Sequence, residues 1–520
     1  MNEDPSRLTM KRVLRMAKKS TAVVGEHIAK ITTAKVQNTT ILFLLAAPIV
    51  VIYYGSYVFD PRNADNVFLY VLQIIADSIA IVTMLGLWLT VLLDVIVLPH
   101  HREHRELAQS VIEKRFTVDV FITAAGEPLD ILQRTIVAAL KIEYPHNTIV
   151  LDDGGSQALR ELTEKLGAFY LARPTNEYAK AGNINFGLAH SRADYFAIFD
   201  ADQVPKPDFL IKTLAHFNDK KIAMVQTPQS FVNTEKFIAN GTAEAQEVFY
   251  RYVCPAKNIS NSAFCVGTNV VFRRSAIDGI GGLARSHSED IWTSYFLHTR
   301  GWRTIFLNEV LAEGQAPATV VAYFKQQRRW ARGGLDMLFN HNPLRSKSLS
   351  LDQALQYLSS NAFFLVGLSI LIYISFPILY LLFDIKPLNT ENGAVWLLHY
   401  LPYFLIYYFL TWLLLGRLSV SLLSTALASF YPYLLALTSV LFEREHAWVA
   451  TTSKEAKVDP IMKWIWPHVL IICLTVVALI VGWYEPVNFW TSLFNTLWAV
   501  VNLYLLLLFI TGDKRIVRHL

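Results

Sequence analysis

The chain has 520 residues, of which 53% are hydrophobic and only 17% carry a charged side chain. Soluble domains usually contain about a quarter charged residues, so this composition indicates a protein embedded in a membrane. The net charge of +5 is modest and requires no nucleic-acid partner. The three cysteines, Cys254, Cys265 and Cys473, lie in contexts that predict neither a disulfide framework nor a zinc site.

The hydrophobic residues are concentrated in long runs that follow a basic segment, residues 1–40. A bilayer core about 30 Å thick needs about 20 apolar helical residues, and most runs reach or approach that length. We expect the basic segment to lie on the cytoplasmic membrane surface as an amphipathic helix. The runs are Ile41–Phe59, Val67–Leu98, Asn361–Phe383, Ala394–Leu415, Leu418–Phe442, His468–Trp483 and Phe489–Ile510.

Basic residues beside the runs predict the orientation in the membrane. Arg102 follows the second run, and Arg345 and Lys347 precede the third, so the positive-inside rule places the polar segment between them in the cytoplasm. Five later spans would leave the basic tail, 512–520, outside. We therefore interpret Leu418–Phe442, which contains several hydroxyl side chains and a proline, as an interfacial helix, and we predict six spans.

The predicted organisation has seven parts in chain order. They are the basic segment 1–40, two spans in 41–98, a cytoplasmic domain in 99–350, two spans in 351–416, an interfacial helix and a loop in 417–462, two spans in 463–511 and a cytoplasmic tail in 512–520.

The segment 99–350 alternates short apolar runs with helical patterns, which predicts an α/β domain with a mostly parallel sheet. Ligands of such sheets bind beyond the carboxyl ends of the strands. We expect strands at Val118–Thr123, Asn147–Leu151, Tyr195–Phe199 and Ala223–Gln226, and helices at Leu129–Leu140 and Ser156–Leu166.

Acidic side chains follow the strand that ends at Phe199. Asp200 and Asp202 are separated by one residue, so both carboxylates can face the same crevice. Mg²⁺ favours one or two carboxylates together with phosphate oxygens. An isolated pair of this kind is more often part of a solvated loop, but its place after a buried strand favours a metal site.

Polar turns follow the first two strands. They read Thr123-Ala-Ala-Gly-Glu127 and Asp152-Asp-Gly-Gly-Ser156, and both lie where a nucleotide would bind on such a sheet. Either turn, taken alone, is better explained as an ordinary polar turn with glycines for positive φ. Lys180, in Lys180-Ala-Gly-Asn-Ile-Asn185, is either a surface lysine or a partner for a diphosphate.

Two more motifs lie between these turns and the third run. Ser288-Glu-Asp290 precedes an amphipathic helix; its carboxylates either favour the helix N-terminus or include a general base, Asp290, for a sugar hydroxyl. Gln326-Gln-Arg-Arg-Trp330 lies shortly before the third run. Indole and guanidinium groups are common membrane anchors, but arginine also binds phosphate in a bidentate manner and indole is a common sugar platform.

The order T-A-A-G-E, D-D-G-G, K-A-G-N, D-A-D, S-E-D and Q-Q-R-R-W resembles the inverting family-2 glycosyltransferases, in the cellulose synthase-like branch, over residues 110–335. The resemblance implies a GT-A-type fold, a UDP-sugar donor, Mg²⁺ or Mn²⁺ as cofactor and a growing polysaccharide as acceptor. The further expected partners are membrane lipids and an accessory export subunit.

The resemblance also implies a role for each matched residue. Asp202 and Asp200 would hold the metal ion, Asp290 would act as the general base, and Arg329 would contact the diphosphate. The donor would be bound by Thr123, Ala125, Glu127, Asp152, Lys180, Asp200, Gln326 and Arg329. The acceptor would be bound by Cys265, in Phe264-Cys-Val-Gly-Thr-Asn269, by Glu289, and by Trp330, which would stack on the terminal sugar.

A gating loop with the family pattern F-x-V-T-x-K is expected after the interfacial helix. The matching stretch is Trp448-Val-Ala-Thr-Thr-Ser-Lys454, in which Thr452 and Lys454 fit the pattern. The aromatic residue, Trp448, is displaced by two positions, and Thr451 replaces the valine. This departure weakens the gating assignment without affecting the catalytic one.

The predicted function is processive polymerisation of UDP-glucose into a β-glucan that crosses the membrane, with a 1,4 or 1,3 linkage. Three departures from cellulose synthases favour a 1,3-linked, curdlan-type product: C-V-G-T-N in place of C-G-S, Gly126 in place of asparagine, and no room for a C-terminal cyclic-di-GMP-binding domain. The alternative is a non-processive transferase that glycosylates a lipid carrier, which needs neither Q-Q-R-R-W nor a channel. Retention of every acidic position disfavours a transporter or scaffold with a degenerate transferase domain.

Overall fold

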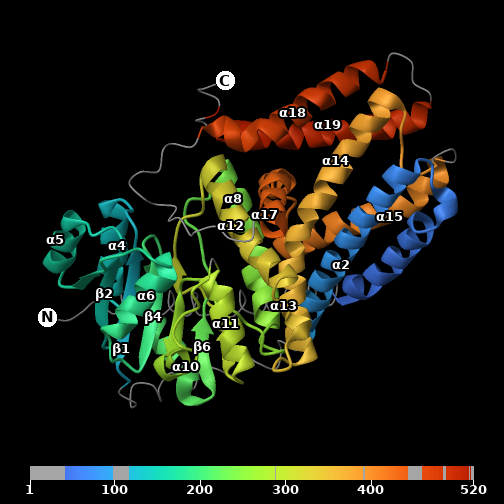
Figure 1. Cartoon of the computed structure of the whole chain (residues 1–520). Helices are drawn as coiled ribbons and strands as arrows, with labels where there is room; N and C mark the ends of the chain where they lie inside the picture. Colours follow the sequence, from blue (N-terminus) through green and yellow to red (C-terminus); the bar gives the residue numbers. More distant parts are fainter. Residues whose placement is uncertain are drawn as a thin grey trace, which may run out of the picture.

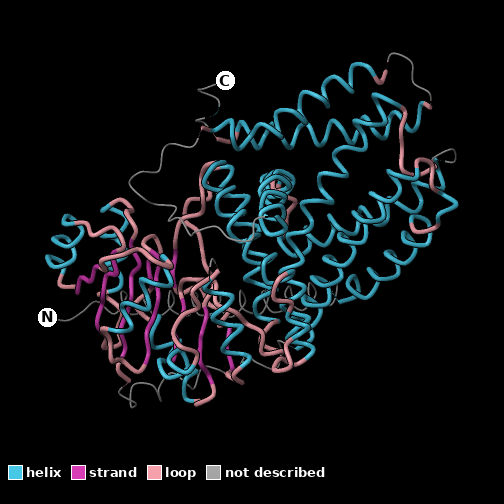
Figure 2. The backbone as a smooth tube through the Cα atoms, viewed as in Figure 1, coloured by secondary structure: helices cyan, strands magenta, loops and turns pink. Residues whose placement is uncertain are grey.

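The computed structural model describes residues 41–97, 116–286, 288–389, 393–442, 460–483, 488–513 and 516. An α/β domain lies at one end of the molecule and a set of long helices at the other (Figure 1). The strands are confined to the α/β domain, as the backbone trace shows (Figure 2).

The α/β domain is built on a seven-stranded sheet in the order β3-β2-β1-β4-β7-β6-β8. Only β7 runs antiparallel to its neighbours, so the prediction of a mostly parallel sheet is confirmed. The strands are β1 (Val118–Ala124), β2 (Asn147–Asp152), β3 (Phe169–Ala172), β4 (Tyr195–Asp200), β6 (Ile222–Gln226), β7 (Val270–Arg273) and β8 (Arg303–Phe306). The short strands β5 (Val204–Pro205) and β9 (Ala312–Glu313) form a separate pair.

Helices cover both faces of the sheet because successive strand residues point into two different cores. In β1, Val120 and Ile122 pack with residues of α4, whereas Phe121 packs with residues of α6. The first core contains α4 (Leu129–Ala139), α5 (Gln157–Leu166) and α7 (Phe209–Leu214), and the second contains α6 (Ala179–Ala189), α10 (Arg274–Gly279) and α11 (Glu289–Thr299).

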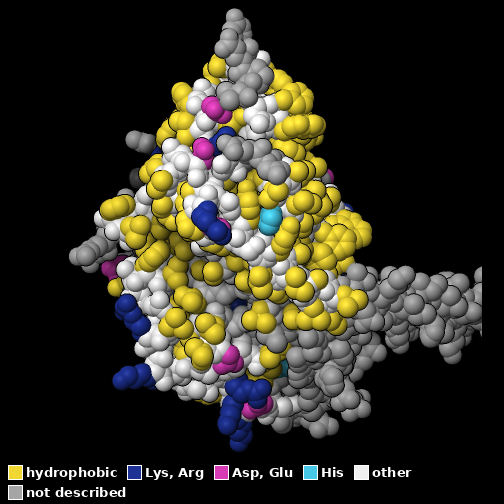
Figure 3. Space-filling model, turned by 90° about the vertical axis from the view of Figure 1, so that its right-hand side faces the viewer, with side chains coloured by type: hydrophobic (Ala, Val, Ile, Leu, Met, Phe, Trp, Pro, Cys, Tyr) yellow, Lys and Arg dark blue, Asp and Glu magenta, His cyan; other side chains and the backbone are white. Residues whose placement is uncertain are grey.

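Seven helices of the described part are long and apolar enough to cross a membrane, so the chain is an integral membrane protein. They are Ile41–Val58, Val67–Leu92, Leu351–Phe383, Ala394–Leu415, Val420–Phe442, Ile461–Val481 and Phe489–Thr511. The corresponding elements after the first are α2 (Val67–Val97), α13 (Leu351–Ala362) with α14 (Val366–Phe383), α15 (Gly393–Leu415), α16 (Val420–Ala428) with α17 (Phe430–Phe442), α18 (Ile461–Val481) and α19 (Phe489–Thr511). Hydrophobic side chains dominate the face shown in Figure 3.

Contacts between helix ends define two sides of this helical part. Away from the α/β domain, Asp65 donates its backbone N–H to Pro387 and Tyr380 bonds to Ser492. Near the α/β domain, Tyr252 donates to the carbonyl oxygen of Leu414 at 2.9 Å. The last helix, α19, ends on this same side, where the carboxylate of Asp513 accepts a hydrogen bond from the backbone N–H of Val320, the first residue of α12 (Val320–Phe339).

The helix pair α16 and α17 differs from the other six candidates. The two helices are separate elements divided at Ser429, and half of the apolar window is buried inside the protein. Helix α16 packs on α8 (Phe237–Val248), where a Cβ atom at Gly241 would overlap the carbonyl oxygen of Ser421. Helix α17 packs on α12 and is seen almost end-on in Figure 1, whereas α14 runs across the picture.

Helix α12 joins the two halves of the molecule. Phe324 packs against residues of α14, α18 and α19, and Leu335 packs against α17. Towards the α/β domain, Gly333 lies against Ser288, the residue before α11. The helix that carries Gln326-Gln-Arg-Arg-Trp330 is therefore held between the membrane helices and the start of α11 in the α/β domain.

Candidate active site

The carboxyl ends of β1 and β4 bring three of the predicted motifs to one carboxylate, that of Asp200. Thr123 lies opposite Asp200 in the sheet and donates its hydroxyl hydrogen to that carboxylate at 3.2 Å. Lys180, in the first turn of α6, forms an ion pair with the same carboxylate and donates to the carbonyl oxygen of Gly267 at 2.7 Å. The sheet edge, α6 and the Cys265 segment thus converge on Asp200.

Lys180 keeps its positive charge at neutral pH in this setting. Burial lowers the pKa of its amine, but the nearby Asp200 and Glu289 carboxylates more than offset this, so the pKa is raised above its ordinary value. A cation at the carboxyl ends of parallel strands is suited to an anionic ligand such as a diphosphate.

The turn after β1 places a second carboxylate beside the first. Glu127 accepts a hydrogen bond from the backbone N–H of Ala125 at 2.6 Å. Burial raises the pKa of Glu127, and the nearby Asp200 and Asp152 carboxylates raise it further. Glu127 and Ala125 therefore lie on the same rim of the sheet as Asp200, where a nucleotide is predicted to bind.

Asp152 has a structural role that the sequence did not predict. Its side chain is completely buried and accepts hydrogen bonds of 2.7 Å from the backbone of Gly154 and Ser156 and from the hydroxyl of Tyr170. The carboxylate therefore shapes the D-D-G-G turn that borders the crevice. Its contact with a nucleotide stays a prediction.

Asp202 lies among other carboxylates and carries a strongly shifted pKa. Burial, and next the charge of Asp200, raise its pKa to about 6. The described residues contain no group of three or more His, Cys, Asp or Glu side chains able to hold a metal ion. Mg²⁺ and Mn²⁺ nevertheless fit here, because such ions need only one or two carboxylates when phosphate oxygens complete the ligand set.

The first turn of α11 brings Asp290 to the same crevice. A Cβ atom at Gly267 would lie 3.5 Å from the Oδ2 atom of Asp290 and 3.6 Å from the Nζ atom of Lys180. Burial raises the pKa of Asp290, although the backbone N–H of Ile291 and the charges of Lys180 and Arg329 lower it in part. Asp290 is thus a stronger base than a solvent-exposed aspartate and lies beside the cation that pairs with Asp200.

Glu289 and Arg329 complete this acidic and basic cluster. Burial, and next the charge of Asp290, raise the pKa of Glu289 to about 7, while Lys180 and Arg329 oppose the shift. Arg329 of α12 therefore lies near enough to both carboxylates to act on their pKa values. The Q-Q-R-R-W and S-E-D motifs, about 40 residues apart in the chain, meet at one place.

The segment Phe264-Cys-Val-Gly-Thr-Asn269 lies between α11 and the sheet. The backbone N–H of Cys265 donates to the hydroxyl of Ser294 on α11 at 2.8 Å, and the N–H of Gly267 donates to the Cys265 sulfur at 3.2 Å. Gly267 has φ +91°, a conformation that glycine adopts at low cost. Burial raises the pKa of Cys265, so the thiol is neutral and suits a packing role beside an acceptor.

The two glutamines of Q-Q-R-R-W have different surroundings. Gln327 is buried and accepts a hydrogen bond from Tyr433 of α17 at 2.9 Å. The buried amide oxygen of Gln326 has no hydrogen-bond partner among the described residues. Arg329 is exposed and Trp330 half-buried on the same helix. The predicted gating residues Trp448, Thr452 and Lys454 lie outside the described residues.

The sequence analysis missed several residues that build the site. Thr268 accepts a hydrogen bond from the backbone of Asp200 at 2.9 Å, and Arg173 pairs with Asp153 and donates to the backbone of Ala179 at 2.8 Å, just before Lys180. Two adjacent glycines, 333 and 334, are unusual inside a helix, and in the sequence they were the feature that indicated a close contact at this point. The structure shows that this contact is with Ser288.

The fold and the site together define a class of protein: a membrane-embedded glycosyltransferase whose GT-A-like domain is flanked by apolar helices. Residues 115–333 match the model of the family described as glycosyltransferase like family 2, and residues 278–421 match the model of cellulose synthase. Together the two matches cover more than half of the chain. The chain belongs to the family-2 glycosyltransferases, in the cellulose synthase family.

Two curated relatives show how far the similarity extends. Cellulose synthase 1 of Komagataeibacter xylinus is 36% identical over 277 residues, which cover 51% of this chain and 18% of the relative. The UDP-forming cellulose synthase catalytic subunit of Pseudomonas fluorescens is 36% identical over 277 residues, covering 51% of this chain and 38% of the relative. The chain thus spans less than two fifths of the length of either relative.

A solved mannosyltransferase from Pyrobaculum calidifontis, in complex with GDP-Man and Mn²⁺, has a TM-score of 0.47 to this chain at 15% sequence identity. The match covers 72% of this chain and 100% of the mannosyltransferase. A similarity of this size gives no information about the ligands of the present site.

Proposed function

We propose that the protein is a processive β-glycosyltransferase that polymerises UDP-glucose into a β-glucan and passes the product across the membrane. The observation that carries this proposal is that Asp290 and Lys180 lie together beside Gly267, with Arg329 of α12 near enough for its charge to lower the pKa of Asp290. This arrangement supports Asp290 as the base, Lys180 as a fixed cation and Arg329 as the side chain that binds the diphosphate, all beside one crevice. The names of the curated relatives, which include UDP-forming cellulose synthase catalytic subunits, support the donor and the product class.

The donor would bind across the carboxyl ends of β1, β2 and β4. Thr123, Ala125, Glu127 and the turn shaped by Asp152 would surround the nucleoside, and Lys180, Gln326 and Arg329 would face the diphosphate. Asp202, with Asp200, would hold Mg²⁺ or Mn²⁺, which when bound supplies positive charge that stabilises the UDP leaving group.

The chemical step would be a single displacement with inversion. The hydroxyl oxygen of the terminal sugar forms a bond to the anomeric carbon of the donor while the bond from that carbon to the UDP oxygen breaks. Asp290 accepts the hydroxyl proton, and Lys180 and Arg329 stabilise the negative charge that develops on UDP. Cys265, Glu289 and Trp330 would hold the acceptor end in place.

A six-span arrangement with the α/β domain in the cytoplasm would serve polymer export. Helices α15 and α19 both end on the side of the α/β domain, as the Tyr252–Leu414 and Val320–Asp513 contacts show. Tyr431 of α17 donates to the carbonyl oxygen of Lys463 near the start of α18, so α17 and the start of α18 also lie together. These contacts support an interfacial position for α16 and α17, on the same side as the catalytic site.

The linkage of the product is open between β-1,4 and β-1,3. The relatives reported above are cellulose synthases, and they give no support to the curdlan-type product that the departures in the Cys265 segment and at Gly126 favoured. We therefore propose cellulose as the first product to test.

A transferase that glycosylates a lipid carrier is the second candidate. The site near β4 would serve both enzymes, because both use the same type of donor. The position of the Arg329 helix, packed between S-E-D and the membrane helices, favours the polymerase, since this helix would connect the acceptor site to a channel.

The test is incubation of inverted membrane vesicles with Mg²⁺ and a panel of labelled UDP-sugars, followed by digestion with linkage-specific hydrolases. We expect label from UDP-glucose in a high-molecular-weight product that a β-1,4-glucanase degrades. Degradation by a β-1,3-glucanase alone would establish the other linkage. Label found only in solvent-extractable lipid would replace this proposal with the lipid-carrier transferase.

A further inference from the structure

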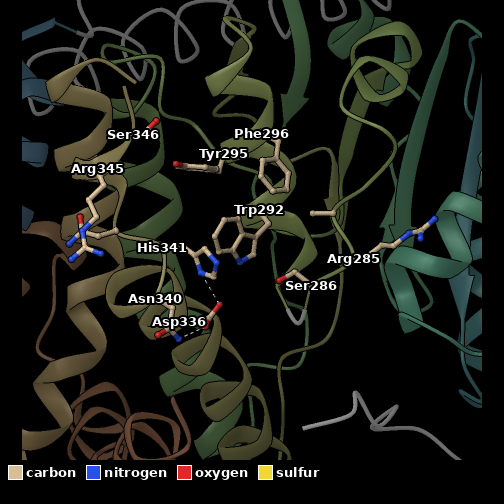
Figure 4. Close-up of a pocket in the computed structure, with 12 residues that line it drawn as sticks. Arg285, Ser286, Trp292, Tyr295, Phe296, Asp336, Asn340, His341, Arg345 and Ser346 are labelled. Carbon is tan, nitrogen blue, oxygen red and sulfur yellow. Dashed lines mark hydrogen bonds and ion pairs between the residues drawn. The ribbon is translucent and has the colours of Figure 1, made fainter. Parts of the chain in front are cut away.

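A cavity of about 570 Å³ opens where α11, the end of α12 and the segment leading to α13 meet. Its lining contains none of the residues assigned above to the donor, acceptor or metal. Three aromatic residues of α11 and three polar or charged residues form much of its wall: Trp292, Tyr295, Phe296, Asp336, His341 and Arg345 (Figure 4).

The acidic side chain of the lining already has partners. Asp336 accepts a hydrogen bond from the side-chain amide of Asn340 at 2.8 Å, and its other oxygen lies 3.9 Å from the Nδ1 atom of His341. The His341 ring in turn meets Trp292 edge-on, with centroids 4.8 Å apart. Negative charge at this site is therefore partly offset by the groups around it.

Two arginines, Arg285 and Arg345, line the cavity, and they differ in their partners. The guanidinium of Arg345 is exposed and makes no hydrogen bond or ion pair with any residue that the structure describes. Arg285 lies on the other side of the aromatic residues in Figure 4, and its guanidinium extends over the ring of Tyr178, 5.2 Å from the centroid. Arg345 is thus the charged group available to an anionic ligand.

The cavity borders the start of a membrane helix. Helix α13 opens the apolar helix Leu351–Phe383, and its Leu351 and Leu355 side chains are 70% and 48% exposed. Leu344, next to Arg345, is 48% exposed as well. Exposed leucines at the start of an apolar helix, a few residues along the chain from the arginine that lines the cavity, suit the boundary between lipid headgroups and acyl chains.

We propose that this cavity binds the phosphate of an anionic phospholipid from the leaflet on the catalytic-domain side, with the acyl chains lying along Leu351 and Leu355. The planar guanidinium of Arg345 matches phosphate oxygens in a bidentate manner. The neighbouring apolar surface distinguishes a lipid from a free phosphate ion. This inference is independent of the proposed function. The occupant would contact α11, whose first turn carries Asp290.

The test measures lipid bound to the full-length protein. Protein is reconstituted in nanodiscs that contain phosphatidylcholine and phosphatidylglycerol, re-extracted in mild detergent, and its retained lipid is quantified by mass spectrometry. The wild type is compared with R345Q and with a matched control, K347Q, which removes the same charge from an exposed residue outside the cavity. We expect several-fold less phosphatidylglycerol on R345Q and no change on K347Q, with equal unfolding temperatures for all three proteins.

Three results would overturn the proposal. Equal losses in R345Q and K347Q would mean general attraction of the basic surface to anionic lipid. Equal retention of the two lipids by the wild type would mean that the cavity does not select a lipid with a net negative headgroup. Binding of inorganic phosphate alone, lost in R345Q and unaffected by added phosphatidylglycerol, would assign the cavity to a soluble ligand.

Discussion

Gly333 of α12 lies so close to Ser288 that a Cβ atom at position 333 would overlap the serine hydroxyl. This contact sets the distance between the first turn of α11, which carries Asp290, and the helix that carries Arg329 and Trp330. The proposed base, Asp290, and the arginine proposed to bind the diphosphate, Arg329, are thus positioned by a glycine that takes no part in the proposed reaction.

Replacement of Gly333 with alanine should lower the rate of polymerisation by about 10²-fold, because a displacement of about 1 Å at a reacting group has an effect of this size. Thermal stability should fall moderately, since overpacking of this kind costs about 1–3 kcal/mol and the helix preference of alanine, about 1 kcal/mol, offsets part of it. The double variant Gly333→Ala/Ser288→Gly removes the clashing atoms and should recover part of the rate. Gly279→Ala, with no atom within 4 Å of its new methyl group, is the control. Full activity in Gly333→Ala would contradict the positioning role.

Asp290→Asn should reduce polymer synthesis by about 10²–10⁴-fold, because the proton of the acceptor hydroxyl loses its acceptor. UDP binding, measured by calorimetry, should be unchanged, since the proposed donor contacts lie on β1, β2, β4, α6 and α12 and none is Asp290 itself. Asp278→Asn, on the exposed side of α10, should behave as the wild type. Normal synthesis by Asp290→Asn would exclude the general-base role.

Trp330→Ala should weaken acceptor engagement by about 2 kcal/mol, or about thirtyfold, through loss of the ring surface. We expect shorter products and an unaltered KM for the donor, as determined by chain-length analysis alongside initial rates. Trp466→Ala, whose indole is 50% exposed on α18, provides a control for general loss of a tryptophan. A donor KM that rises while chain length stays constant would assign Trp330 to the donor instead.

The raised pKa of Asp202, about 6, links stability to pH and to Mg²⁺. A carboxyl group whose pKa is raised on folding stabilises the protein at low pH, and this contribution is lost as pH rises through about 6. Bound Mg²⁺ should reverse the loss above that pH by pairing with the carboxylate. The increase in unfolding temperature caused by Mg²⁺ should therefore be larger at about pH 8 than at about pH 5.

Thermal unfolding in detergent, with Mg²⁺ or with a chelator, measures this effect. Asp202→Asn should remove the pH dependence of the Mg²⁺ effect, whereas Asp130→Asn, on the exposed surface of α4, should retain it. An identical Mg²⁺ effect in Asp202→Asn and the wild type would place the cation elsewhere.

Much of the fold could be predicted because it depends on local patterns. The buried runs at Val118 and Tyr195 and the polar turns after them predicted β1, β4 and the rim of the sheet to within one residue. The strands β3, β7 and β8 were missed, since they are four residues long and too short to show a distinct periodicity. The antiparallel direction of β7 depends on its pairing with β4 and β6, which lie far away in the sequence.

The sequence by itself determined the membrane class, the α/β domain and the family, because apolar length, strand-end carboxylates and motif order are properties of residues along the chain. Only the tertiary structure decided that Lys180 and Asp290 flank Gly267, that Asp152 supports a turn, and that the carboxylate of Asp513 receives the first N–H of α12. These relationships depend on distances between segments up to 193 residues apart. Packing sets such distances, and the order of residues along the chain does not reveal them.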